Sequence, residues 1–577
     1  MEPTAAKPTY NRPAAEDRLW ACLPKIWKLM EITGCPSVSL GVIHEGENIM
    51  QYSRGVADTS TGRPVNDDTV YMIGSLTKAF IAASCGILVD EGKLSWTEPL
   101  STYIPFTQNK DPVIGERMSL SDALSHSSGF PQLDIAWYGS FGETLMFPQH
   151  LLQITANMPV HDDAFRKKFH YSNWPYALAG KVIEAVGGKD SAGGGWGRFV
   201  KRRIFNPLWM TRSTCSRNDI QGGNLAEPHI VLGDGHCNVA GPERLPAPQV
   251  SDRTICGAAM AMWSNIPDML IWSRAVMERL DEEKAGNKNN STSLMNPLRH
   301  ISQITSQKFP VTDDTVNENT YGFGWARHMI PSTQLGWLST NGPQKDDIIG
   351  RESRPRLTLY HGGQVTGYLN SIYLFPETKS AVVVLTNAQS AGDCSDLVAQ
   401  MLVQSLFDMK PEVDFEMRAK KASISSLSLH MKMRADWHRN RRPMTPQPEL
   451  GGFRGSYCND DIKGLIQVRT NSETLRLEMR RNGSDTQRHH LLHYHDDTFS
   501  FCPEDMKQIQ RRCLVDYSSY EQFLLVFIRD EEGTVIGLDW VMQEGFKPLR
   551  YIRQRTAAVS GPPVLRQSPV EDEKRNE

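Results

Sequence analysis

Ser75 and Lys78 stand three residues apart at the start of an apolar stretch that runs to Val89. This stretch predicts a helix that is buried on nearly every face and that ends at Gly92. Residues three apart share one face of a helix, so the two side chains are expected to meet. Burial lowers the pKa of a lysine and lets it act as a neutral base. On spacing alone, an exposed serine and a solvated lysine are commoner, but the apolar context favours an activated nucleophile.

Two later segments carry further side chains that could do chemistry. Tyr171 and Asn173 stand at a junction between a loop and a helix, where the alternative roles are a packed tyrosine and a helix N-cap. His361 is followed by Gly362 and Gly363 in a strand-like segment. Glycines inside a strand indicate the close approach of something else, such as a substrate.

His126 is a further candidate for catalysis. It follows a short predicted helix that begins at Ser119 with a capping box to Asp122. Because Ser75 already has a candidate base in Lys78, the favoured interpretation of His126 is a buried or capping histidine.

The composition is that of a globular protein. The chain has 577 residues, of which 22% are charged and 39% hydrophobic, and its net charge is -3. This charge gives no argument for nucleic acid or an acidic membrane as a partner. The ten cysteines are scattered singly, which favours reduced thiols and offers no zinc signature.

The N-terminal segment does not have the features of an export signal. Residues 1–17 are small and polar, are interrupted by three prolines, and have no apolar core. No stretch approaches the roughly 18 apolar residues that span a bilayer. We therefore expect an intracellular, cytoplasmic protein without a membrane partner.

The pattern along the first 410 residues predicts an α+β fold. A helix is expected over 16–32, then a hairpin of strands 37–43 and 48–52 around Gly46, then the nucleophile helix. Many helices follow, together with a small-residue stretch at 256–262 where backbones can approach closely. Strands return from 321 to 386 before a closing helix at 397–407. This order predicts an antiparallel sheet flanked by helices with a helical subdomain.

The rest of the chain changes character. Charged residues and prolines mark 411–449 as a linker that can include one helix. Six short alternating segments between 464 and 541 then predict a small all-β barrel or sandwich. The predicted domains are thus 16–410, a linker at 411–449, a barrel domain at 450–556 and a disordered tail at 557–577.

Four histidines of the predicted barrel, His489, His490, His493 and His495, resemble a metal cluster at first sight. Neighbours in a strand face opposite sides of a sheet, which argues against a shared metal ion. No metal is expected.

The ordered set of Ser75-x-x-Lys78, Tyr171-x-Asn173 and His361-Gly362-Gly363 resembles the serine hydrolases of the penicillin-binding-protein and class C β-lactamase group. That group includes D-aminopeptidases, esterases and fungal acyl transferases. The resemblance covers about residues 16–409, and residues 125–129 and 204–210 also resemble segments of the family. The second domain is similar to the lipocalin-like module of some relatives.

This resemblance implies a role for each motif. Ser75 would form an acyl-enzyme, Lys78 and Tyr171 would share the work of the general base, and Tyr171 would protonate the leaving group. Asn173 would orient Lys78 and bind substrate. The backbone N–H groups of Ser75 and Gln364, next to Gly362 and Gly363, would form the oxyanion hole. No metal or organic cofactor is implied.

His361 departs from the lysine that is usual in β-lactamases and penicillin-binding proteins. Because a histidine is mostly neutral near pH 7, it is less suited to bind a substrate carboxylate. This favours an intracellular serine hydrolase or acyl transferase that acts on a small ester, thioester, amide or lactone, with a role in secondary metabolism implied by resemblance. A D-aminopeptidase, amidase or β-lactamase activity, and a non-catalytic scaffold on the same fold, are the alternatives.

Overall fold

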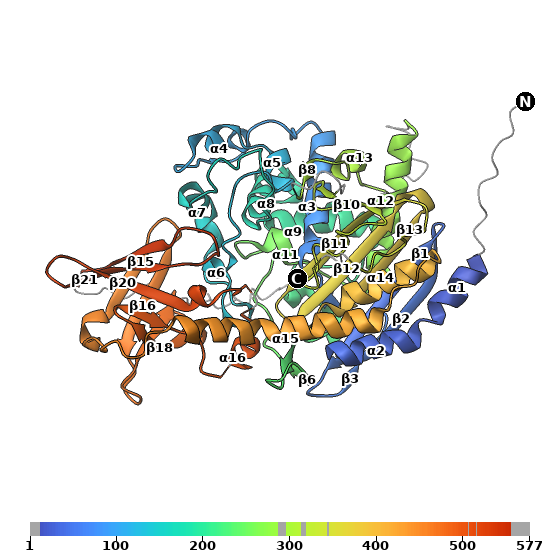
Figure 1. Ribbon diagram of the computed structural model, residues 1–577. Coiled ribbons are helices and arrows are strands. Elements are labelled where there is room, and N and C mark those ends of the chain that lie inside the picture. The colour runs from blue at the N-terminus through green and yellow to red at the C-terminus, as the bar shows by residue number, and fades with distance from the viewer. Residues whose placement is uncertain are drawn as a thin grey trace, which may run out of the picture. The chain divides into compact units, whose positions relative to one another are not determined.

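The structure is a computed structural model that describes residues 12–286, 296–312, 319–342, 346–505, 507–514 and 516–555 (Figure 1). The chain forms two compact units. The described residues up to Ala435, together with Asp505–Asp516, form the first, and those of Asp436–Glu504 and from Tyr517 onward form the second.

An antiparallel sheet is the centre of the first unit. Within the described residues it has nine strands. In spatial order these are β3 (Arg63–Pro64), β2 (Glu47–Asp58), β1 (Ser37–His44), β13 (Ser380–Thr386), β12 (Tyr368–Phe375), β11 (Arg356–Val365), β10 (Ala326–Ile330), β9 (Asn319–Tyr321) and β8 (Phe309–Pro310). Glu45 and Gly46, both at positive φ, form the tight turn of the expected hairpin between β1 and β2.

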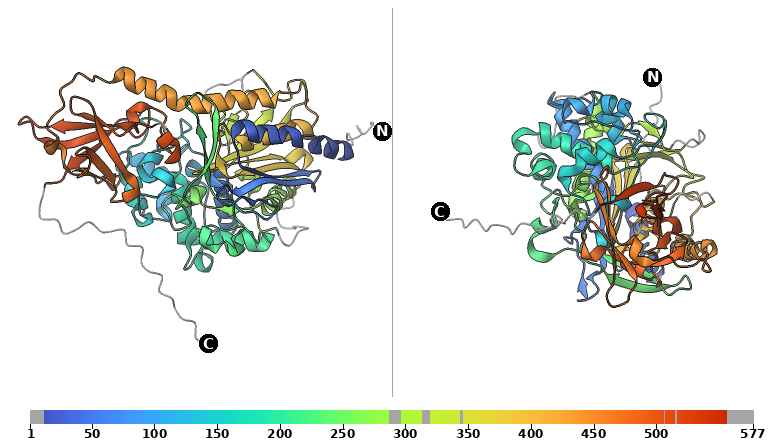
Figure 2. Two further views of the ribbon diagram at one scale, coloured as in Figure 1. Left: turned by 90° about the horizontal axis from the view of Figure 1, so that it is seen from below. Right: turned by 90° about the vertical axis from the view of Figure 1, so that its left-hand side faces the viewer.

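Helices cover both faces of this sheet, which explains why every residue of β1, β12 and β13 is buried. On one face, α1 (Arg12–Trp20), α2 (Leu23–Thr33) and α14 (Cys394–Leu406) share a hydrophobic core with the strands (Figure 1, Figure 2). On the other face, α12 (Ile266–Lys284) packs closely at Gly41, where a Cβ would lie 2.7 Å from Ile266. The predicted α+β architecture is therefore confirmed.

The single helix predicted over 16–32 is wrong. The structure has two helices, α1 and α2, with a break at Ala21 and Cys22. Pro24 is the cause, because it has no N–H to donate to the carbonyl of Trp20, four residues earlier. It is instead accommodated in the first turn of α2.

The predicted nucleophile helix is α3 (Thr77–Asp90), and all its residues from Thr77 to Leu88 are buried. Several further helices belong to the first unit. They are α4 (Pro112–Arg117), α5 (Leu120–Leu124), α6 (Asp134–Trp137), α7 (Leu151–Asn157), α8 (Trp174–Val186), α9 (Gly195–Val200), α10 (Asn206–Leu208), α11 (Gly257–Met260), α13 (Ile301–Ile304) and α16 (Lys507–Arg511). Of these, α8, α9, α11 and α13 contact α3. Ser119 and Asp122 form the expected capping box of α5.

Two small sheets complete the first unit. One pairs β4 (Tyr71–Met72), which ends three residues before Ser75 in the sequence, with β7 (Trp263–Ser264). The other joins β14 (Ala388–Gln389), β5 (His229–Gly233) and β6 (Val239–Arg244).

Most of the segment predicted as a linker is one helix, α15 (Phe415–Asn440). Its residues up to Ala435 belong to the first unit and the remainder to the second. The sequence allowed one helix here but did not indicate its length. The predicted tail at 557–577 lies outside the described residues.

The second unit contains a closed antiparallel barrel, as expected for a small all-β domain. Its strands are β15 (Gly455–Asn459), β16 (Gly464–Thr470), β17 (Leu477–Arg481), β18 (Arg488–His495), β19 (Thr498–Ser500), β20 (Leu524–Arg529), β21 (Val535–Trp540) and β22 (Leu549–Arg553). The sequence analysis missed the first and the last of these strands. Buried aromatic rings, such as Phe453 against Phe499 at 4.9 Å, pack the core of this unit. In β18, His489 is buried and His490 is exposed, as alternation requires.

All ten cysteines are free thiols. In the part of the chain that the structure describes, none of the helices combines the length and the apolar character needed to cross a lipid bilayer.

Candidate active site

Ser75 lies in a 3₁₀ turn, η1 (Gly74–Leu76), that continues directly into α3. Ser75 is 9% exposed, so it is almost entirely covered by the surrounding chain. Gly74 has a φ of +55°, and a Cβ there would lie 2.9 Å from the backbone of Gln364. The turn that presents Ser75 is thus pressed against the end of β11, which only a glycine at position 74 permits.

The end of β11 is free of β10, because the first residue of β10, Ala326, pairs with Tyr360. A Cβ at Gly363 would lie 2.1 Å from the carbonyl oxygen of Ile73, and one at Gly362 would lie 2.7 Å from that of Leu338. The close approach predicted for these glycines is therefore made by the chain itself, and not by a substrate. It brings the backbone of Gln364 beside the Ser75 turn; its role in an oxyanion hole stays a prediction.

Lys78 is wholly buried and connects three parts of the chain. Its Nζ lies 2.9 Å from Ser75 Oγ, 2.9 Å from Asn173 Oδ1 and 3.1 Å from the carbonyl oxygen of Ala259. Burial lowers the pKa of Lys78 to about 7, against an opposing upward effect of the Asp134 carboxylate.

The geometry around Nζ suits both protonation states of Lys78. A charged ammonium donates to all three oxygen atoms. A neutral amine still donates to Asn173 Oδ1 and to the Ala259 carbonyl, neither of which can donate in return. Its lone pair is then directed at the hydroxyl of Ser75, which is the arrangement that a general base requires.

Tyr171 also approaches Ser75, and its hydroxyl interacts with the Ser75 side chain. Its ring centroid is 4.7 Å from Lys78 Nζ. Burial raises the pKa of Tyr171 well above its usual value, so the side chain is a neutral phenol at ordinary pH. A neutral phenol can give a proton but is poorly suited to take one, which favours Lys78 over Tyr171 as the candidate base.

Asn173 occupies the residue before α8, but its side chain makes no capping bond. Asn173 is thus the N-cap residue of α8 by position, but its side chain does not cap the helix. Its Oδ1 accepts from Lys78, and its Nδ2 lies 3.1 Å from each carboxylate oxygen of Asp134.

His361 is buried, and both of its ring nitrogens have partners within the protein. Nδ1 lies 2.6 Å from the carbonyl oxygen of Gly362, and Nε2 lies 2.8 Å from the hydroxyl of Tyr321. Since a carbonyl can only accept, Nδ1 carries the proton and Nε2 accepts from Tyr321. Burial and the nearby Lys78 lower the pKa of His361 to about 3, so it is neutral.

His126 is also buried and neutral, as the favoured interpretation held. Its Nδ1 accepts from the backbone N–H of Ser172 at 3.2 Å, and its ring lies 4.3 Å from that of Tyr171. Burial, followed by the charge of Lys78, holds the pKa of His126 well below its usual value. It packs behind Tyr171 and makes no direct contact with Ser75 that would mark it as a base.

Two polar groups of this site, a carboxylate and a backbone carbonyl, were not predicted from the sequence. Asp134 is buried behind Asn173, and its only signal was a lone carboxylate in the apolar stretch 130–137. The carbonyl of Ala259 reaches Lys78 because small residues in α11 allow close packing; a Cβ at Gly180 of α8 would lie 2.7 Å from Ala258. The stretch at 256–262 was noted for this property, but its target was not identified.

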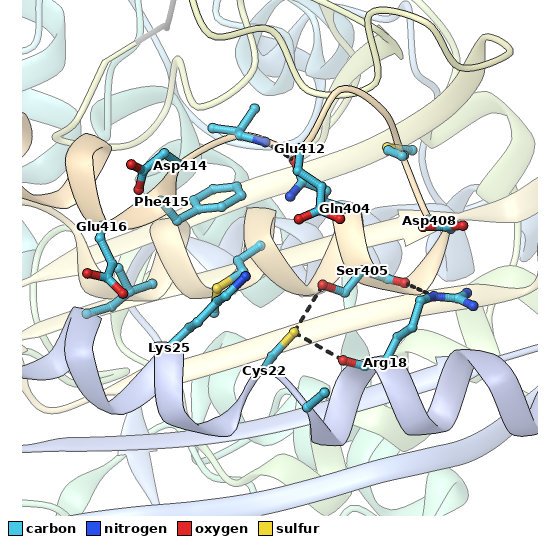
Figure 3. Close-up of a pocket in the computed structure, with 15 residues that line it drawn as sticks. Arg18, Cys22, Lys25, Gln404, Ser405, Asp408, Glu412, Asp414, Phe415 and Glu416 are labelled. Carbon is cyan, nitrogen blue, oxygen red and sulfur yellow. Dashed lines mark hydrogen bonds between the residues drawn. The ribbon is translucent and has the colours of Figure 1, made fainter.

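A separate hollow of about 440 Å³ lies between α1, α2, α14 and the start of α15 (Figure 3). There the Cys22 thiol lies 3.0 Å from Ser405 Oγ. None of the motif residues lines this hollow. Among the residues described, no three His, Cys, Asp or Glu side chains are grouped to hold a metal ion.

All three motifs lie within the part of the chain that matches a known family. A family model described as Beta-lactamase matches residues 25–404. The chain is 24% identical over 397 residues to unguisins hydrolase ungD' of Aspergillus campestris, covering 66% of this chain and 64% of that protein. It is 23% identical over 410 residues to unguisins hydrolase ungD of Aspergillus violaceofuscus, covering 68% and 64%. The matches thus span less than two thirds of the length of these relatives.

A more distant relative is protein flp of Staphylococcus aureus, with 21% identity over 363 residues, 62% of this chain and 60% of that protein. Among solved structures, the octameric penicillin-binding protein homologue from Pyrococcus abyssi matches with a TM-score of 0.52 and 18% identity, covering 93% of this chain and 99% of that chain. At this identity the structural similarity concerns the fold.

Proposed function

Because this chain belongs to the Beta-lactamase family, we propose that it is a serine hydrolase that acts through an acyl-enzyme at Ser75. The observation that carries the proposal is the 2.9 Å contact between Lys78 Nζ and Ser75 Oγ, made by a buried lysine whose pKa is lowered to about 7. Few structural roles require a lysine to be buried at such a cost in hydration.

In the proposed reaction, Ser75 Oγ attacks the carbonyl carbon of the substrate while its proton moves to Lys78 Nζ. The backbone N–H groups of Ser75 and Gln364 stabilise the negative charge on the carbonyl oxygen. When the bond to the leaving group breaks, Tyr171 gives that group a proton and regains one from Lys78. The net transfer is from Ser75 to the leaving group, and water reverses these steps to release the acid.

The substrate we propose is a small ester, thioester, amide or lactone. Neutral His361 supports a substrate without a carboxylate to be bound by charge at this position, which disfavours β-lactams. The two Aspergillus relatives, which are named hydrolases, support hydrolysis over acyl transfer. An amidase or D-aminopeptidase uses the same machinery, so only the choice of substrate separates it from an esterase.

Labelling with a fluorophosphonate tests the proposal. Mass spectrometry of the folded protein is expected to find one adduct, on Ser75, that is lost in Ser75→Ala. Ser84→Ala is the matched control, because Ser84 is buried in the same helix and donates to the carbonyl of Phe80. An unlabelled wild-type protein would favour a non-catalytic scaffold. Esters, thioesters, lactones, amides, D-aminoacyl peptides and β-lactams, each with and without an added acyl acceptor, then define substrate and reaction.

A further inference from the structure

Asp134, at the start of α6, is the most heavily hydrogen-bonded carboxylate near Ser75. Oδ1 accepts from Trp137 Nε1 at 2.8 Å, Oδ2 accepts from Gln132 Nε2 at 3.0 Å, and Asn173 Nδ2 is 3.1 Å from both oxygens. Each of these neighbours is an N–H donor. Burial raises the pKa of Asp134, while the hydrogen bonds from these donors and the charge of Lys78 lower it. A protonated Asp134 would direct its own hydrogen at a donor, so the hydrogen bonds favour the ionised form.

This carboxylate determines how Asn173 is oriented. The amide has an oxygen end that accepts and a nitrogen end that donates. With the nitrogen end bound to Asp134, the oxygen end must face Lys78 Nζ, as observed at 2.9 Å. A reversed amide would place two donors against each other at Lys78 and leave the Asp134 oxygens without this partner.

The same carboxylate acts on Lys78 through its charge. It is the strongest opposing influence to burial, and it raises the pKa of Lys78. Lys78 otherwise faces Cys256, whose thiol has a raised pKa, the rings of Tyr171 and Tyr176, and the neutral imidazoles His126 and His361. Asp134 is therefore the one anionic carboxylate among the described groups that face this amine.

We propose that Asp134 is a positioning residue for the Ser75–Lys78 pair, which it serves by fixing the amide of Asn173 and by supplying the negative charge that balances protonated Lys78. The inference rests on the proposed function and names a residue that none of the three motifs contains. Asp134 does not touch Ser75, so its effect on the reaction passes through Asn173 and Lys78.

A second carboxylate supports the charged state of Asp134. Asp516 comes from the segment Asp505–Asp516, which belongs to the same compact unit. Burial and the charge of Asp134 raise the pKa of Asp516 to about 7. With its pKa raised to about 7, Asp516 is protonated at mildly acidic pH and adds no negative charge beside Asp134 there.

The rate at which a fluorophosphonate labels Ser75, measured between about pH 5.5 and about pH 9, tests this role. In Asp134→Asn, the carboxamide oxygen can still accept from Asn173, but the charge is gone. In the plot of labelling rate against pH, we expect the midpoint of the rise on the acidic side to move about one pH unit lower. We expect the plateau rate at higher pH to fall about tenfold. Asp252→Asn is the matched control, because Asp252 is a half-buried acid of the same unit whose charge does not act on Lys78.

Gln132→Ala is a milder variant in case Asp134→Asn does not fold. Gln132 is exposed and its loss removes a single donor from Asp134, so the midpoint is expected to move in the same direction by a smaller amount. A lower plateau with an unchanged midpoint in both variants would overturn the inference, because a purely structural residue would behave in that way. A wild-type protein that is not labelled at Ser75 would overturn the proposed function and this inference with it.

Discussion

The hydroxyl of Tyr321 lies 2.8 Å from Nε2 of His361, and the two groups satisfy each other in a fully buried position. With Nδ1 bound to the Gly362 carbonyl, no ring nitrogen of His361 is left for a substrate. The third motif of this chain thus places a neutral, internally bonded histidine within β11. Its partner Tyr321 packs against the rings of His126 and Tyr171.

This contact predicts non-additive stability losses. Tyr321→Phe leaves Nε2 of His361 unpaired, and His361→Ala removes the acceptor of the Tyr321 hydroxyl, which keeps only its interaction with Tyr176. Each change is expected to cost about 1–3 kcal/mol. The double variant removes both groups, so its loss is expected to be well below the sum of the single losses. Chemical denaturation of the four proteins measures this, and strictly additive losses would show that the two groups do not interact.

A second prediction concerns Gly363. An alanine there would put its Cβ 2.1 Å from the carbonyl oxygen of Ile73 and force the nucleophile turn away from β11. We expect Gly363→Ala to reduce the rate of Ser75 labelling by about 10²-fold, because a displacement of about 1 Å misaligns the reacting groups. Gly452→Ala is the control, since a Cβ at that position meets nothing closer than 3.9 Å. Labelling of Gly363→Ala at the wild-type rate would rule out this geometric requirement.

The burial of Lys78 predicts how stability changes with pH. The pKa of Lys78 is about 7 in the folded protein and about 10.4 when unfolded. Between these values the unfolded state binds more protons, so the free energy of unfolding rises with pH. Lys78→Met has no titrating group at this position, so it lacks this pH-dependent contribution to the free energy of unfolding. Relative to the variant, the wild-type protein is expected to gain on the order of 3 kcal/mol between about pH 6.5 and about pH 9.5.

Denaturation of both proteins at the two pH values measures this difference, because the other titrating groups are common to both. A difference that is independent of pH would mean that the lysine keeps an ordinary pKa in the fold, and the assignment of Lys78 as a base would lose its support.

Tyr171→Phe tests whether Tyr171 acts as the acid while Lys78 acts as the base. Fluoride leaves a fluorophosphonate without needing a strong proton donor, whereas an amine or alkoxide leaving group needs one. We therefore expect this variant to be labelled at a rate within about tenfold of the wild-type rate, while its turnover of an amide or ester falls about 10²–10⁴-fold. Lys78→Ala is expected to lose both fluorophosphonate labelling and turnover. Equal losses of labelling and turnover in Tyr171→Phe would instead show that the phenol takes part in activating Ser75.

The sequence predicted the fold where local patterns determine it. The apolar stretch after Ser75 gives a buried helix, and alternating segments give six of the barrel strands. Local patterns were insufficient where tertiary contacts decide. Strands β15 and β22 are short, and they pair with each other only where the barrel closes. The break at Cys22 is different, because Pro24 was a local signal that the prediction of a single helix did not take into account.

Local sequence patterns also predicted only part of the candidate site. The spacing of Ser75 and Lys78 is local, so their contact could be predicted. Asp134 lies 39 residues before Asn173, on a four-residue helix, and only the folded chain brings its carboxylate behind the amide. The segment Asp505–Asp516 is short and polar, and nothing in its sequence shows that it packs with the first unit while its flanks belong to the second.

The pH dependence of Ser75 acylation is the most direct test of the central claim, that Lys78 takes the proton of Ser75. Intact-mass time courses with a fluorophosphonate are to be recorded from about pH 5.5 to about pH 9. We predict a rate that rises about tenfold per pH unit below the Lys78 pKa of about 7 and levels off above it. A rate that does not change across this range, or a limb whose midpoint lies near the pKa of an ordinary lysine, would contradict the account.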